Sequence, residues 1–432
     1  MVGSSGRIAA QALKQAGYTV DVFDCFGDMD TRLAARYVGL VPDTKEAPFL
    51  PAHSALIPLV QDWKALNPSG LVVTTTGFES SPDTLDKLNL LGGILGNQAQ
   101  CVTCCKDPVV FYRRCLQLGL STPALLPPFS HLRDRQSNAD NSDEATDTTS
   151  CNSPSRNSPS RKAIPQWLKK TMGASGGAHI EVVSFDEAIQ LKAPFYAQQY
   201  VEGIALSALF LNGPECVVLS IHRQYLAPSS ERPFRFGGLV VDADIPEPAC
   251  ISLANACHSI CRQFGLVGLN GLDAIWDGAT LWLLEINPRP PASLALYPNA
   301  LLAPLFEAHL ISCLRAAKPT PLLPNFNTII GLDALNSAHF HANRNTLWPA
   351  SHNLLNRGMA IVYASALLSI PADFQFPSGC HDLPILPRTF QAGEPICSIV
   401  ISDGGLGKLR AQVKALRECL NPVAGEDLLY YL

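Results

Sequence analysis

The stretch FGLVGLNGLDAIWDGATLWLLEINPRPP, residues 264–291, decides the fold of this chain. Its pattern predicts two apolar strands joined at Asp277-Gly278, a pair typical of hairpin turns. In the second strand Glu285 and Asn287 are two residues apart, so both side chains project from one face. Arg289 follows where the strand ends. The hairpin therefore presents oxygen ligands beside a guanidinium group.

Asp273, on the first strand, joins that face in one kind of register only. A two-residue turn would set Asp273 opposite Trp282 and point it away from Glu285. A three-residue loop or one bulge would set Asp273 opposite Leu283 and bring the two carboxylates together. We expect the second geometry.

Asp273, Glu285 and Asn287 would then form a metal site. Two carboxylates and an amide oxygen suit Mg²⁺, which prefers oxygen ligands and shares its shell with water and nucleotide phosphates; Mn²⁺ is an alternative. Arg289 would stabilise negative charge on a transferring phosphoryl or acyl group. The competing interpretation is a surface hairpin with scattered charges, but burying these groups without partners would cost on the order of several kcal/mol.

The composition indicates a well-buried soluble protein of two or three domains, with 432 residues, 47 % apolar and 16 % charged. A net charge of −5 gives no reason to expect nucleic acid or an anionic membrane as a partner. No apolar run approaches a bilayer-spanning length and the first residues lack signal-peptide features, so we expect a cytoplasmic protein. The 14 cysteines are expected to be reduced. Zinc at Cys101, Cys104 and Cys105 is disfavoured, because no second ligand pair follows at zinc-site spacing.

The first 100 residues predict a parallel α/β domain, because helical segments alternate with strands. A Gly/Ser turn at 3–6 leads into a helix over 7–16, followed by strands over 18–23 and 71–75. Only Met1 and Val2 precede the turn, so the strand that usually comes before such a turn is missing. The segment 24–30 lies at the carboxyl end of a strand, where open α/β sheets place their ligands.

Three lysines stand next to recognisable local signals. Lys106 precedes Asp107-Pro108, a helix entry with a capping aspartate and a proline at the first helical position. Lys169 and Lys170 end a strand that runs into the glycine-rich loop 173–177. Glycine permits close approach and lysine supplies charge, so phosphate binding is favoured over a plain glycine hairpin. Adjacent strand residues face opposite ways, so only one of the two lysines can reach a ligand at the loop.

Two further segments differ in composition from the rest. Residues 130–162 are rich in Ser, Asn, Asp, Thr and Arg, with almost nothing apolar to bury, and predict a disordered insertion. From about residue 321 onward, strands separated by proline-rich turns and a helix over 406–419 predict a β-rich closing module, in which we find no catalytic cluster.

These motifs together resemble the ATP-grasp superfamily, whose members mostly join a carboxylate to an amine at the expense of ATP. Asp273, followed twelve positions later by Glu-x-Asn-Pro-Arg, is similar to the metal and phosphate signature of that superfamily. The phrases TGFES, WLKKTMGASGGAHI, PFRFGG and LEINPRPPASL resemble the branch that contains the tyramine-glutamate ligases of methanofuran synthesis and related proteins of one-carbon (methanopterin/methylofuran) metabolism. The resemblance covers about residues 70–300 well.

The resemblance implies an α/β protein with the ATP-grasp fold. A parallel α/β (pre-ATP-grasp) domain would occupy 1–100, the ATP-grasp domain 101–320 and a small β-rich C-terminal module 321–432. Lys106 and Lys170 would contact the nucleotide phosphates, under a flexible lid. The residues implied for the lid are Gly173, Ser175, Gly176 and Gly177, and those for the adenine hinge are Gln199, Tyr200, Val201 and Glu202. Ala205 stands where the superfamily has a ribose-binding acid, and the sequence leaves open whether Glu202 takes its place.

The implied activity is an ATP-dependent, ADP-producing ligase that activates a carboxylate as an acyl phosphate and joins it to an amine, with Lys170 and Arg289 as catalytic residues. The expected cofactors are ATP and Mg²⁺, and the expected partners are a small carboxylate and a small amine. The sequence leaves open whether the protein forms a homodimer. A phosphotransferase that uses the same nucleotide site is one alternative. A nucleotide-binding regulator without turnover is another, kept open by the missing ribose acid.

Overall fold

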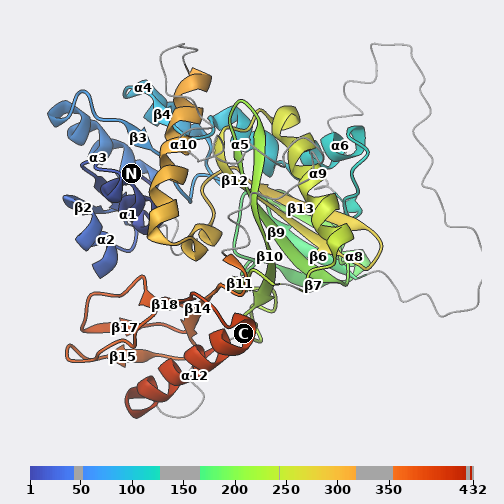
Figure 1. Cartoon of the computed structure of the whole chain (residues 1–432). Coiled ribbons are helices and arrows are strands. Elements are labelled where there is room, and N and C mark those ends of the chain that lie inside the picture. Colours follow the sequence, from blue (N-terminus) through green and yellow to red (C-terminus); the bar gives the residue numbers. More distant parts are fainter. Residues whose placement is uncertain (43–51, 127–165, 243, 318–353, 425–428, 431–432) are drawn as a thin grey trace, which may run out of the picture.

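The computed structural model describes residues 1–42, 52–126, 166–242, 244–317, 354–424 and 429–430 (Figure 1). The predicted insertion at 130–162 lies outside these ranges. Within them, no helix is both long and apolar enough to cross a membrane.

The N-terminal region is the expected parallel α/β unit. The strands β1 (Asp21–Asp24) and β2 (Tyr37–Leu40) pair in parallel, as do β3 (Val72–Val73) and β4 (Ile94–Leu95). Val2 bridges in parallel to Phe23 on one side and to Thr74 on the other, so it occupies the position of the strand that the sequence seemed to lack. The helices of this region are α1 (Arg7–Gln15), α2 (Met29–Ala34), α3 (His53–Leu66) and α4 (Asp83–Leu90).

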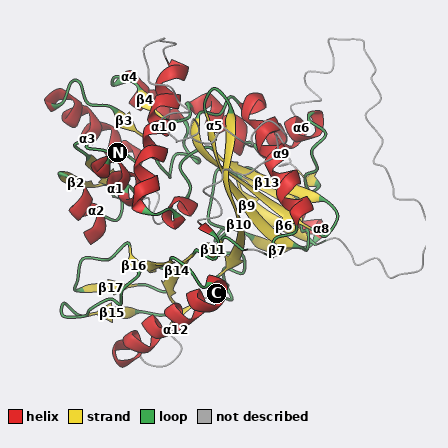
Figure 2. Ribbon diagram, viewed as in Figure 1, coloured by secondary structure: helices red, strands yellow, loops and turns green. Residues whose placement is uncertain are grey.

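The central element is a nine-stranded sheet that is antiparallel throughout (Figure 2). Its order is β13 (Leu281–Asn287), β12 (Gly268–Trp276), β9 (Ile204–Asn212), β10 (Cys216–Leu226), β11 (Phe236–Val240), β14 (Gly358–Ala364), β18 (Pro395–Ile401) and β16 (Cys380–His381), with β19 (Leu429–Tyr430) on β14. The C-terminal strands therefore extend the same sheet that carries the hairpin. The pair β15 (Leu368–Ile370) and β17 (Arg388–Phe390) and the helix α12 (Gly405–Ala424) complete the C-terminal part.

A second, four-stranded antiparallel sheet carries the glycine-rich loop. Its order is β5 (Leu125–Leu126), β8 (Phe195–Gln199), β6 (Trp167–Thr171) and β7 (Glu181–Val183), with the short helix α8 (Phe185–Ala188) after β7. The loop 173–177 connects β6 to β7, as the sequence predicts.

Helices cover both faces of the central sheet, and the alternation of β9 explains why. Leu206 and Ala208 belong to the same apolar cluster as Leu253 of α9 (Glu247–Phe264). Leu209 follows Ala208 and so points to the opposite face, where it belongs to the same apolar cluster as Phe306 of α10 (Asn299–Ala317). Side chains of a strand alternate between faces, so one apolar strand is buried on both sides. The helices α5 (Ala99–Lys106) and α6 (Pro108–Gln117) join the α9 side, and the short helix η2 (Ala292–Leu296) the α10 side.

Asn97 connects the N-terminal region to the end of the hairpin. Its Nδ2 donates to Oδ1 of Asn270 at 2.8 Å and to the carbonyl of Pro288 at 2.9 Å, and its Oδ1 accepts from the backbone N–H of Val267 at 2.8 Å. The side chain is buried, so these partners would lack water if it were removed.

We expect Asn97→Ala to lower the free energy of unfolding by about 2 kcal/mol or more, because several buried polar groups lose their partner at once. The matched control is Asn89→Ala, which removes one exposed side chain that accepts a single bond from the N–H of Ile94 at 3.2 Å. Calorimetric melting of the two variants beside the wild type checks this. Equal losses in both would contradict the role given to Asn97.

Candidate active site

A cavity of about 620 Å³ lies where the two sheets, the N-terminal region and the C-terminal strands meet. Its lining includes Ser5 and Thr76 from the N-terminal region, Lys170 and Gln198 from the four-stranded sheet, Asp273 and Glu285 from the central sheet, and Asp382 and Ser398 from the C-terminal part. Polar and charged side chains thus converge on one space from four parts of the chain, an arrangement typical of ligand sites.

The hairpin brings the two carboxylates together, but in a register that differs from the predicted one. Trp276 pairs with Leu281, so the loop spans residues 277–280 rather than the two or three considered from the sequence. A bulge follows, and Asp273 lies directly opposite Glu285, not opposite Leu283. The longer loop was not predicted because Asp277-Gly278 favours a two-residue turn, whereas here the Asp277 Oδ1 accepts from the backbone N–H groups of residues 279 and 280.

The bulge also decides which way Glu285 points. Leu281 and Leu283 pack in the apolar cluster beneath α9, and a strict alternation would send Glu285 into that cluster as well. Leu284 is the extra residue of β13, so the parity changes after it. Glu285 and Asn287 therefore face the cavity, as Asp273 does, while Ile286 returns to the apolar side.

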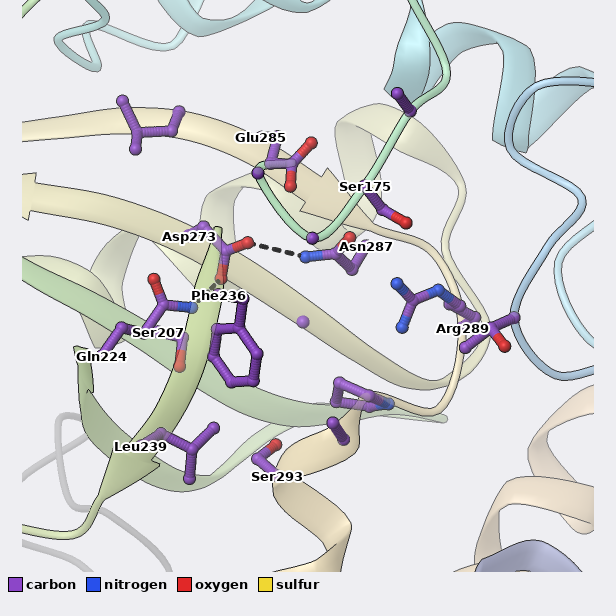
Figure 3. Close-up of a pocket in the computed structure, with 18 of the residues that line it drawn as sticks. Ser175, Ser207, Gln224, Phe236, Leu239, Asp273, Glu285, Asn287, Arg289 and Ser293 are labelled. Atoms are coloured by element: carbon purple, nitrogen blue, oxygen red, sulfur yellow. Dashed lines mark hydrogen bonds between the residues drawn. The ribbon is translucent and has the colours of Figure 1, made fainter. Parts of the chain in front are cut away.

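Hydrogen bonds connect the three predicted metal ligands and Lys106. Figure 3 shows the three predicted ligands. The Nζ of Lys106 lies 3.0 Å from Oε2 of Glu285 and 3.2 Å from Oδ1 of Asn287. Asn287 Nδ2 donates to Oδ2 of Asp273 at 2.8 Å, and Gln224 Nε2 donates to Oδ1 of Asp273 at 3.0 Å. The close-up shows Gln224 and Asn287 approaching Asp273 from opposite sides. Gln224, on β10, was not singled out from the sequence.

The environment separates the pKa values of the two carboxyls. Burial and the neighbouring Glu285 raise the pKa of Asp273 to about 7. Burial also acts to raise the pKa of Glu285, but Lys106 and Lys170 outweigh it and the pKa is lowered. His179, which follows the glycine-rich loop and lines the cavity, has its pKa lowered to about 4 by burial. Its imidazole is neutral at pH 7.

The two lysines of β6 have different environments. Lys170 is buried, lines the cavity and donates from Nζ to Oε1 of Gln198 at 2.7 Å. Lys169 pairs instead with Glu181 at 3.1 Å, on the outer side of the sheet. Burial lowers the pKa of Lys170, although Glu285 acts in the opposite direction. Lys106 also has a buried side chain, and it ends α5 immediately before Asp107, which caps α6 through the N–H groups of residues 109 and 110.

The glycine-rich loop packs against two other parts of the chain. Gly173, Gly176 and Gly177 have φ values of 70°, 73° and 71°, which favour glycine. A Cβ on Gly173 would meet the carbonyl oxygen of Glu79 at 2.4 Å, and one on Gly177 would meet that of Phe234 at 2.0 Å. The loop thus leaves no room for side chains at these contacts. All three glycines and Ser175 line the cavity.

The predicted hinge between β8 and β9 is placed in part as expected. Gln199, Tyr200 and Val201 line the cavity. Glu202 is exposed and is not part of the lining, whereas Ala205 is. The positions of Glu202 and Ala205 therefore give no support to the idea that Glu202 takes the place of the ribose-binding acidic residue.

Arg289 has a partner that sequence reasoning did not assign. Its Nε forms an ion pair with Oε1 of Glu79, from the N-terminal region, whose Oε2 accepts from the N–H of Gly77 at 2.8 Å. Burial acts to raise the pKa of Glu79, but Arg289 and Lys106 hold it at about 2. The sequence feature that could have indicated a role for Glu79 is the segment TGFES, residues 76–80, which follows the carboxyl end of a strand.

The donor set fits a magnesium ion that shares its shell with other ligands. Asp273, Glu285 and Asn287 supply hard oxygen atoms to the cavity. No group of three or more His, Cys, Asp or Glu side chains that could hold a metal ion occurs in the described ranges, so this site would rely on two carboxylates and one amide oxygen. Two carboxylates near these atoms have a cationic partner: Glu285 pairs with Lys106, and Glu79 pairs with Arg289. A bound triphosphate would add negative charge, which a metal cation would help to offset.

Comparisons with known proteins identify a similar domain and similar folds. Residues 143–293 match a family model described as the ATP-grasp domain. The structure of N5-carboxyaminoimidazole ribonucleotide synthetase from Thermus thermophilus matches with a TM-score of 0.57 and 17 % identity, over 99 % of each chain. Biotin carboxylase from Campylobacter jejuni gives 0.58 and 10 %, over 97 % of this chain and 90 % of that one. L-amino acid ligase from Bacillus licheniformis gives 0.55 and 14 %, over 99 % and 96 %.

A search of the curated proteins gives no match. At these identities the solved structures establish the fold alone, and they establish it over nearly the whole chain. The predicted fold class is confirmed: the chain has the ATP-grasp fold. Residues 143–293 are thus similar to the ATP-grasp domain family, and the solved structures extend the likeness of fold to the rest of the chain.

Proposed function

We propose that this protein is an ATP-dependent ligase that activates a carboxylate as an acyl phosphate and joins it to an amine. The observation that carries the proposal is the meeting of Lys106, Lys170, Asp273, Glu285 and Asn287 in one cavity. The names of the similar structures, a synthetase, a carboxylase and an amino acid ligase, favour the same class of reaction.

ATP would bind between the two sheets. The ammonium groups of Lys106 and Lys170 would neutralise the phosphates, and the backbone N–H groups of the loop 173–177 would close over them. The hinge formed by Gln199, Tyr200 and Val201 would take the adenine edge. Asp273, Glu285 and Asn287 would hold one or two Mg²⁺ ions, which would offset the charge on the phosphates. The carboxylates of Asp273 and Glu285 would exchange their present partners for the cation.

The reaction would proceed in two steps. An oxygen of the substrate carboxylate attacks the γ-phosphoryl group, which breaks the bond to ADP and forms an acyl phosphate. The amine nitrogen then attacks the acyl carbon, inorganic phosphate leaves, and the amine loses a proton as the amide forms. Arg289 would stabilise negative charge in both transition states, held in place by Glu79. Such a site works by positioning and charge neutralisation and needs no catalytic histidine.

The choice of substrates rests on the sequence resemblance. Glutamate and tyramine, in a step of one-carbon cofactor (methylofuran or methanopterin) biosynthesis, are the pair that this resemblance favours. We include in this proposal a cytoplasmic location and the option of a homodimer. A nucleotide-binding regulator is the second candidate, and the observation that favours it is the absence of an acidic side chain at Ala205, with Glu202 exposed.

Phosphate release tests the proposal. We expect purified protein with Mg-ATP to release ADP and phosphate only when both an acid and an amine from a panel are present, with glutamate and tyramine as the first pair. Glu285→Gln should lower the rate by about a hundredfold or more, because a ligand for the charge-neutralising cation is lost. ATP binding without release for every pair would favour the regulator. A phosphorylated product without an amide would favour a phosphotransferase.

The adjacent lysines of β6 provide a matched pair of variants. Lys170→Met should lower kcat/KM for ATP by about a hundredfold or more, since a buried positive charge next to the phosphates disappears. Lys169→Met should stay within about threefold of the wild type, because that lysine pairs with Glu181 outside the cavity and surface pairs contribute little. Steady-state kinetics with ATP as the varied substrate distinguishes them. Equal effects of the two changes would contradict the assignment of Lys170.

A further inference from the structure

A group of sulfur and imidazole side chains lies outside the cavity, where the start of β10 meets the last turns of α9. Cys216 is the first residue of β10. His258 and Cys261 are three positions apart on α9, so they project from one side of the helix. In the part of the chain that the structure describes, none of the three residues lines the cavity. The proposed ligase reaction therefore makes no use of them.

The two cysteines face each other between the strand and the helix. The thiol of Cys261 donates to the Sγ of Cys216, and the two sulfur atoms are 2.9 Å apart. Both residues are free cysteines in this structure. The bond of a disulfide is about 2.0 Å long, so a closure of about 1 Å would join the two sulfur atoms.

The two cysteines differ in their access to solvent. Cys216 is partly exposed, at the start of its strand. Cys261 is buried, with 1 % of its surface exposed, and packs in the apolar cluster of α9. A reagent that arrives from solvent would therefore meet Cys216 first, and Cys261 would follow as the internal partner.

The neighbours of Cys216 favour its thiolate form. Hydrogen bonds with Cys261 and with His258 lower the pKa of Cys216, although burial acts in the opposite direction. The hydrogen bond with Cys216 raises the pKa of His258, and the charge of Glu215 adds to this effect. Burial raises the pKa of Cys261, which stays a thiol. A thiolate beside an imidazolium, next to a second thiol, is typical of a redox-reactive cysteine with a resolving partner.

Cys250, on the same helix, has a different environment. It is also partly exposed, but burial and the charge of Glu247 raise its pKa. A thiol reacts through its thiolate form, so Cys250 should be the less reactive of the two partly exposed residues. What distinguishes Cys216 is therefore its neighbours, not its exposure.

We infer that Cys216 and Cys261 form a peroxide-reactive thiol pair, in which a hydroperoxide oxidises Cys216 and Cys261 then closes an intramolecular disulfide. This modification site does not depend on the proposed ligase function. The disulfide would join the first residue of β10 to the last turns of α9.

The oxidation takes two steps. The thiolate of Cys216 attacks one oxygen of hydrogen peroxide, the O–O bond breaks, and the leaving hydroxide takes the proton of His258 to become water. Cys216 is then a sulfenic acid. The sulfur of Cys261 attacks the sulfur of Cys216, the S–O bond breaks, and the thiol proton leaves with the hydroxide as a second water. The two sulfur atoms together lose the two electrons that the peroxide gains.

The test treats the reduced, full-length protein with one equivalent of hydrogen peroxide and maps its peptides by mass spectrometry without reduction. We expect the Cys216 and Cys261 peptides to become linked, and dithiothreitol to separate them again. Oxidation of Cys216 should be about tenfold or more faster than oxidation of Cys250 in the same molecules. This comparison needs no variant, so it stands even if a substitution impairs folding.

Three variants separate the roles of the two cysteines. Cys261→Ser should accumulate the sulfenic acid at Cys216, where dimedone traps it, because the resolving thiol is gone. Cys216→Ser should form neither the adduct nor the disulfide. The matched control Cys250→Ser should react like the wild type. The inference is overturned if no Cys216–Cys261 link forms, if Cys216 reacts no faster than Cys250, or if Cys261→Ser gives no dimedone adduct at Cys216.

Discussion

The bulge at Leu284 is the constraint on which the site depends. The strand β13 must bury Leu281 and Leu283 under α9 and yet present Glu285 to the cavity. A regular strand cannot do both, because these positions share one face. One extra residue resolves the conflict and also places Asp273 directly opposite Glu285. The carboxylate pair and the apolar core are thus two results of the same local irregularity.

The charges around this pair explain why the cavity is built from several parts of the chain. Lys106 comes from the end of α5, Lys170 from the second sheet, and Glu79 from the N-terminal region. Glu285 contacts Lys106, and Glu79 contacts Arg289, so the two carboxylates have cations from different parts of the chain. The glycine-rich loop adds a further link, because Gly173 packs against the carbonyl of Glu79 and Gly177 against that of Phe234.

Local patterns predicted much of this fold, and long-range partners were beyond them. The hairpin, the cap at Asp107 and the opposite orientations of Lys169 and Lys170 follow from turn chemistry, capping and strand alternation. The loop length and bulge did not, since they depend on packing under α9. The Glu79–Arg289 pair joins positions 210 residues apart, which no periodicity reveals.

Transfer of an oxygen atom tests the central claim most directly. The substrate carboxylate, glutamate or whichever acid supports phosphate release, is labelled with ¹⁸O and turned over with the amine and Mg-ATP. An acyl phosphate requires one labelled carboxylate oxygen to leave with the phosphate, so mass spectrometry should find inorganic phosphate carrying a single ¹⁸O atom. Unlabelled phosphate formed at the same rate as the amide would contradict activation through an acyl phosphate.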